Sequence, residues 1–560
     1  MGRLHVTQIE QRLQQTVMPH VDCSDLGAHG PEQQKQTKNS RSLAAFVIMK
    51  LGGVTETEAA SAVTDESGDN GIDAIIALSE ESRIVVTQSK WSNDSGGSAA
   101  SSDMIKFREG IDDLLSLNWH KFGTKLQSKS SDLEKLLLDP NAKIDIVFAH
   151  LGTSDVAPAV AEIMDSYLAE LNDPTEIGTF NYLNQGRIHK MLVEETEGTQ
   201  IDLDVALSDW GVIEGPPAAY YGHVSASDIS SWYQQHGKSI LSKNVRVALS
   251  DSEVNDGLLK TLTTEPDKFW YFNNGITVLC ERIDKSAAGG TDRRIGVFRA
   301  TNASIVNGAQ TASVLHKFKQ QGGELSSVQV MARFISLNGA EETFSSEVTR
   351  ATNTQNRIGG RDFVALDPQQ KRIKDEFSVA GYTYTYRTGE ESPSPESGCD
   401  LTQATVALAC AHSPQLATQA KREISRLWDD IERAPYRSLF NGKTTYVRIW
   451  RCVEILRLVE DSLSKEKSTL EGRDRLVATH GNRAILNLIF SQLNMAKIDD
   501  PDYKWSNEAS KVSTLLPQVL SAVIKEVTSN HPGYPASLFK NSSKVSALES
   551  TVVAHLKDAQ

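Results

Sequence analysis

Apolar positions in the first 200 residues recur with two different periods. A helical period marks five segments: residues 7–18, 42–51, 55–63, 104–117 and 156–171. Runs of apolar and β-branched residues predict three strands: residues 72–78, 83–91 and 143–151. A further strand is expected near Ile177 and a further helix near Val193, and Ser42 is a candidate N-cap that follows a polar stretch over 22–40. This alternation predicts a mixed α/β domain.

The remainder of the chain divides into two regions by the same criteria. Residues 199–390 combine short strands and helices and are rich in asparagine, glutamine and glycine. The stretch TGEESPSPESG, from Thr388 to Gly398, is typical of a linker. Beyond it the period is mostly helical. The expected architecture is therefore a multidomain α/β (α+β) protein with an N-terminal domain over 1–198, a central domain over 199–390 and a helical region over 391–560.

Composition narrows the class of protein. Of the 560 residues, 39% are hydrophobic and 23% charged, which excludes collagen-like, coiled-coil and largely disordered chains. No apolar run approaches the roughly 18 residues of a membrane-spanning helix, and the N-terminus lacks the apolar core of a secretory signal. Five scattered cysteines without a CxxC pair are typical of reduced thiols. We therefore expect a soluble cytoplasmic protein.

The formal net charge of −14 disfavours a protein that coats nucleic acid by its bulk charge. The net charge does not exclude a local basic groove. It also does not exclude a metal-dependent nuclease, because the acidic residues of its metal site add to the negative charge.

Candidate chemistry first occurs in GDNGIDAII, which is followed by SRIVVTQSKW. Alternate residues of a strand share a face, so Gln88 and Lys90 point to the same side of the second predicted strand. If the two strands form a hairpin, Asp73 lies beside this pair. The Asp73 carboxylate and the Gln88 carbonyl could hold Mg²⁺ or Mn²⁺. Lys90 could then orient water and stabilise charge on a phosphate, which is the chemistry of phosphodiester hydrolysis.

This arrangement resembles the PD-(D/E)XK nuclease superfamily, and within it the Mrr-like branch in which the second element reads Q-x-K. The resemblance implies a restriction-endonuclease-like N-terminal domain with Asp73, Gln88 and Lys90 as catalytic residues. It also implies a further acid on the preceding helix, for which Glu58 is the candidate. Glu56 and Asp69 come next, and Asp69 is a candidate metal ligand with Asp73 and Gln88.

The motif is short, so a plainer interpretation stays open. Asp73 could cap a turn, and Lys90 could be a solvated strand end. The predicted order of helix, glycine-rich turn, two strands, helix and strand favours the nuclease interpretation.

A second group of motifs is rich in amide side chains, which both donate and accept hydrogen bonds without charge. These motifs are FWYFNNGITVLC over 269–280, IVNGAQTASVLH over 305–316 and EVTRATNTQNRIGGRDFVALDPQQKRIKDEF over 347–377. The candidate ligand-binding or nucleic-acid-binding residues are Asn273, Asn274, Asn307, Gln310, Asn353, Gln355, Asn356, Arg357 and Arg361. Residues 350–374 hold six basic side chains against two aspartates, which is compatible with a phosphate-backbone site. A surface helix with ordinary charges explains the same pattern.

These motifs, with ILSKNVRVALSDSEVNDGLLKTL over 240–262, resemble the AIPR family, named for abortive-infection phage resistance. The resemblance runs from about Tyr220 to about Leu456. It implies a role in bacterial antiviral defence. AIPR proteins commonly carry an N-terminal segment of the GxDxGIDA…QSK kind, so the two resemblances support each other.

Other chemistries lack their motifs. Two GK[ST] triplets occur without the first glycine of a phosphate-binding loop, and no G-x-S-x-G nucleophile elbow is present. The thirteen histidines show no paired zinc spacing.

The sequence thus predicts a Mg²⁺- or Mn²⁺-dependent endonuclease of phage defence that cuts nucleic acid, with DNA favoured over RNA by the resemblance alone. The first alternative is a sensor or regulatory binding protein whose nuclease domain is inactive or gated by a partner. The second is a restriction subunit that needs a companion motor, because the chain has no phosphate-binding loop of its own. A second copy of the chain and a companion defence protein are candidate partners, and no membrane partner is expected.

Overall fold

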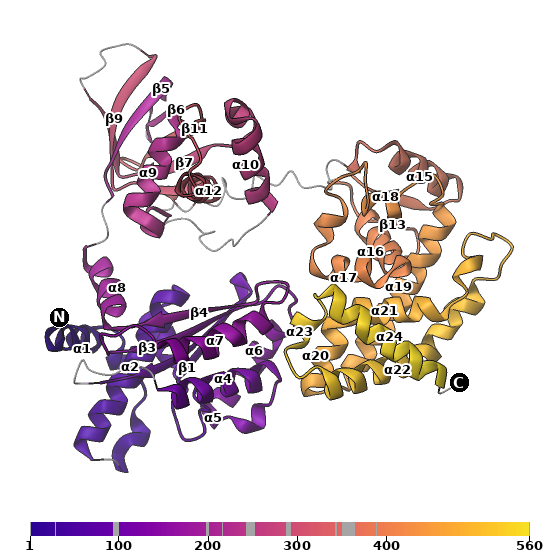
Figure 1. The fold of residues 1–560 in the computed structure, drawn as a ribbon, viewed down its shortest axis with the longest axis horizontal. Helices are drawn as coiled ribbons and strands as arrows, with labels where there is room; N and C mark the ends of the chain where they lie inside the picture. The colour runs from indigo at the N-terminus through magenta and orange to yellow at the C-terminus, as the bar shows by residue number, and fades with distance from the viewer. Residues whose placement is uncertain are drawn as a thin grey trace. The chain divides into compact units, whose positions relative to one another are not determined.

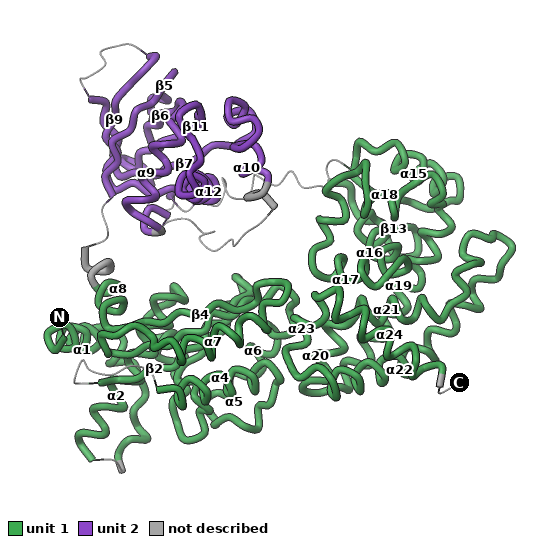
Figure 2. Tube along the Cα trace, viewed as in Figure 1, with its two compact units in different colours: residues 1–192, 359–560 green, residues 193–358 purple. Residues whose placement is uncertain are grey.

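The computed structural model describes residues 2–28, 30–92, 100–197, 201–215, 217–241, 253–286, 293–341, 344–345, 347–349, 364–387 and 389–558. The chain forms two compact units (Figure 2). Unit 1 comprises residues 1–192 and 359–560, and unit 2 comprises residues 193–358. Within the described residues, no helix combines the length and the apolar character needed to cross a membrane.

The N-terminal part of unit 1 is built on a four-stranded sheet in the order β1-β2-β3-β4 (Figure 1). The strands are β1 (Ala74–Leu78), β2 (Arg83–Lys90), β3 (Lys143–His150) and β4 (Gly178–Leu183). β1 and β2 form an antiparallel hairpin in which Ala74 pairs with Thr87, whereas β2, β3 and β4 are parallel. The hairpin predicted from the alternating pattern is therefore present.

Helices cover both faces of this sheet, because alternate strand residues are apolar on both sides. Ile84 and Val86 pack with residues of α4 (Ser101–Leu115), α6 (Ser130–Leu137) and α7 (Pro158–Leu171). On the opposite face Val85 packs with residues of α1 (Arg3–Gln15), α2 (Pro31–Gly52), α3 (Glu56–Ser61) and α8 (Gln185–Glu197). The short helices are η1 (Met18–His20), η2 (Ser24–Ala28), η3 (Ser79–Glu81), η4 (Trp119–Lys121) and α5 (Thr124–Gln127).

The second helix begins eleven residues earlier than the apolar period predicted. Proline is favoured in the first turn of a helix, and α2 starts at Pro31. The first two turns expose mostly polar side chains and so carry no apolar period. Ser42 is not an N-cap: it lies inside α2, where its hydroxyl donates to the Lys38 carbonyl.

Unit 2 contains a seven-stranded sheet in the order β10-β7-β11-β6-β5-β9-β8. Its strands are β5 (Leu203–Ile213), β6 (Ala219–Ser225), β7 (Ile276–Cys280), β8 (Arg282–Lys285), β9 (Ile295–Thr301), β10 (Ser304–Asn307) and β11 (Gln329–Ser336). Its helices are α9 (Ala226–His236), η5 (Gly237–Leu241), α10 (Glu253–Thr264), η6 (Pro266–Lys268), α11 (Phe269–Phe272) and α12 (Ala309–Gln320). Val330 and Phe334 of the sheet share a core with Trp232 of α9 and Leu315 of α12.

The C-terminal part of unit 1 is mostly helical, as the sequence predicted. It begins with α15 (Pro368–Val379), β12 (Thr383–Thr385), β13 (Gly398–Asp400), α16 (Leu401–His412), α17 (Pro414–Arg422), η7 (Ile424–Leu427) and α18 (Tyr436–Leu439). It continues with α19 (Tyr446–Lys467), α20 (Gly472–His480), α21 (Asn482–Gln492), η8 (Met495–Lys497), α22 (Ser506–Asn530), α23 (Pro535–Leu538) and α24 (Ser542–Asp558). Within the expected linker from Thr388 to Gly398, residues 389–397 form a mostly exposed loop between the paired strands β12 and β13, and Arg457 donates to the carbonyls of Pro395 and Gly398.

The helical part of unit 1 packs directly against the N-terminal part. The Leu137 carbonyl, at the end of α6, accepts from the Tyr534 hydroxyl at 2.6 Å and lies 2.9 Å from His480 Nε2. Arg475 pairs with Glu134 at 2.8 Å. These contacts, of which the two at Leu137 are buried, join α6 to helices more than 300 residues away in the sequence.

The buried imidazole at this contact predicts a pH dependence of folding stability. Burial, with Lys421 nearby, lowers the pKa of His480 from 6.5 to about 3. As the pH falls below 6.5, the unfolded chain gains a proton that the folded chain excludes. The contribution of neutral, buried His480 to the free energy of unfolding is therefore lost between pH 6.5 and about 3. We expect the free energy of unfolding to fall more steeply for the wild type than for His480→Gln, by up to about 1.4 kcal/mol per pH unit. Urea unfolding across this window measures both slopes, and equal slopes would contradict the assignment.

Candidate functional site

Asp73 lies immediately before β1, where the hairpin meets the preceding loop. Its backbone N–H donates to the Thr87 carbonyl at 2.9 Å and so extends the hairpin by one residue. Its carboxylate accepts from the Ser89 N–H at 2.7 Å and from the Ser89 hydroxyl at 3.2 Å. The side chain is buried and fixed in position.

Two further acids lie beside Asp73. Carboxylate oxygens of Asp65, Asp69 and Asp73 all lie within 4.8 Å of one another. All three come from the loop between α3 and β1, so nine consecutive residues supply the whole cluster. Oxygen donors at this spacing are suited to a hard divalent cation such as Mg²⁺ or Mn²⁺.

Backbone contacts fold this loop back on itself. The N–H groups of Thr64 and Asp65 both donate to the Asp73 carbonyl, at 2.8 and 3.1 Å. The Gly71 N–H donates to the Asp69 carboxylate at 2.8 Å, and Gly71 has a φ of 81°. A side chain at Gly71 would meet the Phe107 backbone at 3.1 Å, so glycine lets the loop pack closely against α4.

The crowded acids change the titration of Asp73. Burial, together with the nearby carboxylates of Asp65 and Asp69, raises its pKa to about 7. The hydrogen bond from Ser89 and the charge of Lys90 oppose this increase. A buried carboxylate that repels its neighbours is stabilised when a cation joins them.

Arg41 of α2 binds the cluster through Asp65. Its guanidinium is buried, donates to Asp65 through Nε at 3.0 Å and forms a bidentate pair with Asp25 at 2.6 and 2.7 Å. It also donates to the backbone carbonyls of Asp22 and Asp65. Arg41 thereby fixes Asp65 and compensates part of the local negative charge.

Gln88 and Lys90 are placed as the strand pattern predicted. Gln88 is 1% exposed, and its Oε1 has no hydrogen-bond partner among the described residues. An unpartnered buried carbonyl is a donor atom available to a cation. Lys90 is half exposed, and its Nζ lies 3.4 Å from Asp103 of α4.

Glu58 and Glu56 lie apart from the acidic cluster. Glu58 accepts from the backbone N–H and the hydroxyl of Thr55, and so completes a capping box at the start of α3. Glu56 lies exposed in the same first turn. The third acid of the cluster is instead Asp65, which the motif comparison did not select.

Two of the amide-rich motifs of unit 2 contact each other. Asn273 donates to the Thr311 hydroxyl at 3.1 Å and accepts from the Gly275 N–H at 2.8 Å, which joins the Asn274 turn to the start of α12, beside Gln310. Asn307 ends β10 and pairs with Thr277. Five further candidates lie outside the described residues: Asn353, Gln355, Asn356, Arg357 and Arg361.

The described part of the basic segment is electrostatically paired. Lys371 pairs with Asp375, Arg372 with Glu376 and Lys374 with Glu390. These pairs favour the surface-helix interpretation for α15, because little unbalanced charge is left to attract phosphate.

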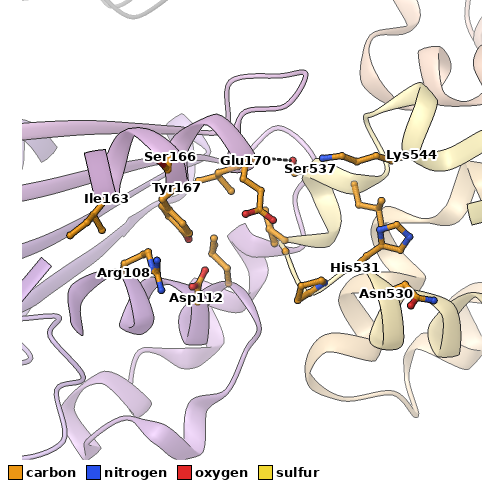
Figure 3. Close-up of a pocket in the computed structure, with 16 residues that line it drawn as sticks. Arg108, Asp112, Ile163, Ser166, Tyr167, Glu170, Asn530, His531, Ser537 and Lys544 are labelled. Atoms are coloured by element: carbon orange, nitrogen blue, oxygen red, sulfur yellow. Dashed lines mark hydrogen bonds between the residues drawn. The ribbon is translucent and has the colours of Figure 1, made fainter. Parts of the chain in front are cut away.

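A cavity of about 630 Å³ lies on the other side of α4, away from the acidic cluster. Figure 3 shows Arg108 and Asp112 of α4 near Tyr167 of α7, with His531 on the opposite wall. Burial raises the pKa of Asp112. α4 therefore borders both the acidic cluster and this cavity.

The contacts of Arg41 predict a large effect of its replacement. Arg41→Lys keeps one charge but cannot reach both carboxylates and both carbonyls, so we expect unfolding to become easier by about 3 kcal/mol. Lys35→Ala is the control, because Lys35 is exposed and its single ion pair with Glu10 contributes about 1 kcal/mol or less. Chemical denaturation measures both, and wild-type stability in Arg41→Lys would show that the network is not needed.

Comparison with known proteins gives one match. The family model described as "AIPR protein" matches residues 241–532, which is just over half of the 560 residues. No curated protein and no solved structure matches the chain. The match begins later than the predicted start near Tyr220 and extends beyond the predicted end near Leu456, and the acidic cluster lies outside it. The chain belongs to the AIPR family.

Proposed function

We propose that the chain is a metal-dependent nuclease that acts in abortive-infection phage defence. Family membership supports the role in defence. The observation that carries the reaction is the convergence of three aspartates within 4.8 Å, beside the unpartnered Gln88 carbonyl and near Lys90. Carboxylates, a neutral oxygen and an ammonium group are together suited to phosphodiester hydrolysis.

Asp69, Asp73 and Gln88 would hold the cation, with Asp65 as a further ligand. Bound Mg²⁺ or Mn²⁺ supplies Lewis-acid polarisation of a phosphoryl oxygen and lowers the pKa of a water. Ser89 holds the Asp73 carboxylate in place, and Arg41 does the same for Asp65. Lys90 would orient an attacking water and stabilise negative charge on the phosphate.

The preference for DNA over RNA rests on the Q-x-K element alone, because this element resembles that of restriction enzymes. The N-terminal sheet supports the proposed restriction-like architecture to this extent: an antiparallel hairpin carries the acid and the Q-x-K element, and two parallel strands follow.

Two ion pairs favour a gated form of the same function. Lys106 binds Asp69 at 3.0 Å, and Asp103 lies 3.4 Å from Lys90. Both partners belong to α4, so this helix occupies groups that the reaction needs. A partner or ligand that shifts α4 would release a metal ligand and the lysine together.

The first prediction for this function concerns cleavage. Asp73→Asn and Lys90→Ala should each lower metal-dependent cleavage by at least about 100-fold, because each removes a charged group from the reacting centre. Plasmid, single-stranded DNA and RNA, each with Mg²⁺, Mn²⁺ or EDTA, identify the substrate class. Glu56→Gln is the control. Glu56 is exposed on α3, so this variant should cleave like the wild type. Full cleavage by Lys90→Ala would exclude the assigned site.

The second prediction concerns metal binding and does not depend on turnover. Mn²⁺ at about 100 times its Kd should stabilise the wild type by about 2.7 kcal/mol, because only the folded chain brings the acids together. Asp73→Asn should lose this stabilisation, whereas Glu58→Gln should keep it. An equal metal effect in wild type and Asp73→Asn would place the cation elsewhere. A metal effect without cleavage would identify the gated form.

A further inference from the structure

A sharp turn joins two acids of the cluster, Asp69 and Asp73. Asn70 and Gly71, which follow Asp69, have φ angles of 52° and 81°. Both angles lie in the left-handed region, which glycine adopts freely and asparagine adopts at some energetic cost. A backbone of this kind persists where the surrounding structure holds it in place.

One face of α4 holds this turn by two contacts. The Asn70 side chain donates from Nδ2 to Oδ2 of Asp113 at 2.9 Å. The Asn70 carbonyl lies so close to Gly110 that a Cβ at Gly110 would meet the carbonyl oxygen at 2.1 Å. Residues three apart in a helix share a face, so Gly110 and Asp113 contact Asn70 together. Because Gly110 has no side chain, the turn can approach α4 closely enough for the hydrogen bond to Asp113.

Asp113 is itself fixed in position. Its side chain is 14% exposed. The oxygen that does not contact Asn70 accepts from Asn118 Nδ2 at 3.0 Å and from Lys121 Nζ at 2.7 Å. Burial favours the protonated acid, but the hydrogen bonds from Lys121, Asn118 and Asn70 outweigh it and lower the pKa of Asp113. Asp113 is therefore an ionised acceptor with both oxygens engaged.

The conformation of the turn determines where the Asp69 carboxylate lies. The Gly71 N–H donates to this carboxylate at 2.8 Å. Because the donor belongs to the turn, a change in the backbone of the turn moves the Asp69 side chain relative to Asp73. In the hydrogen bonds of the described residues, Asp113 reaches this loop through Asn70 alone.

We propose that Asp113 is a positioning residue of the cation site, because its hydrogen bond to Asn70 holds the turn that places Asp69 beside Asp73. This inference rests on the proposed function, in which both aspartates hold the cation. Without the hydrogen bond, the turn can relax toward commoner backbone angles, and repulsion then separates the two carboxylates. Loss of a residue that orients metal ligands typically weakens metal binding by about 10- to 100-fold.

The main test is Asn70→Gly in the full-length protein, with Mn²⁺ as the probe. Glycine adopts a φ of 52° without strain, so this variant removes the hydrogen bond to Asp113 without adding strain or changing a charge. The Kd of Mn²⁺ measured by calorimetry should rise at least about tenfold. Each titration is made well below the Tm of that variant in EDTA, so that unfolding does not contribute.

The matched control is Lys121→Ala. It removes another donor from the same Asp113 carboxylate but leaves the hydrogen bond from Asn70 in place. Mn²⁺ should bind this variant at least as tightly as the wild type, because a positive charge is removed near the site. Binding weakened as much as in Asn70→Gly would overturn the proposal.

Two changes at Asp113 separate the hydrogen bond from the charge. Asp113→Ala should raise the Kd of Mn²⁺ at least about tenfold, and adding Asn70→Gly should change it little further, because both remove the same contact. Asp113→Asn removes the charge but keeps a hydrogen-bonding group for the Asn70 amide, so its Kd should lie much closer to that of the wild type. Equal weakening in Asp113→Asn and Asp113→Ala, or effects of Asn70→Gly and Asp113→Ala that multiply, would overturn the proposal.

The wild type tests the proposed function separately. No Mn²⁺ binding by the wild type would contradict the cation site itself. Mn²⁺ binding by the wild type that is unchanged in Asn70→Gly would contradict the role of Asp113 and leave the cation site intact. Neither result depends on nuclease activity.

Discussion

Electrostatic repulsion among Asp65, Asp69 and Asp73 is the constraint on which the N-terminal part of unit 1 depends. Three carboxylates within 4.8 Å would separate in an unsupported loop. The fold holds them by contacts from three directions: Arg41 from α2, Ser89 from β2 and Lys106 from α4. The first two of these groups are buried and so act with little screening by solvent. Burial raises the pKa of Asp73, and the repulsion that these contacts do not neutralise adds to that increase.

α4 connects this constraint to the rest of unit 1. One face of the helix supplies Asp103, Lys106 and Gly110, which contact Lys90, Asp69 and the Asn70 turn. Another face supplies Arg108 and Asp112 to the cavity in Figure 3. The opposite wall of this cavity is formed by residues at the end of α22 and just after it, among them His531. Interiors are close-packed, so a helix with both faces engaged moves as a unit. α4 is thus the helix that borders both the acidic cluster and this cavity.

The sequence predicted those parts of the structure that have a regular period. The β1–β2 hairpin follows from alternation and places Gln88 and Lys90 on one face, and Asp73 stands at the predicted end of that hairpin. Asp65 was missed because its proximity to Asp73 arises from two backbone hydrogen bonds in a turn, which leave no periodic signal. The cap formed by Thr55 and Glu58 could have been recognised, since T-x-x-E is the pattern of a capping box. The first turns of α2 are exposed and polar, so an apolar period could not reveal them.

The family match and the acidic cluster occupy different stretches of sequence. Contacts at the Leu137 carbonyl join the two parts of the chain in space. Leu137 ends α6, which packs under the sheet that carries Asp73, and its carbonyl is contacted by His480 from within the matched region and by Tyr534 just beyond it. Burial lowers the pKa of His480 to about 3, so its imidazole is neutral in this contact at physiological pH. The helical half of the AIPR region is thus packed on the domain that holds the acids.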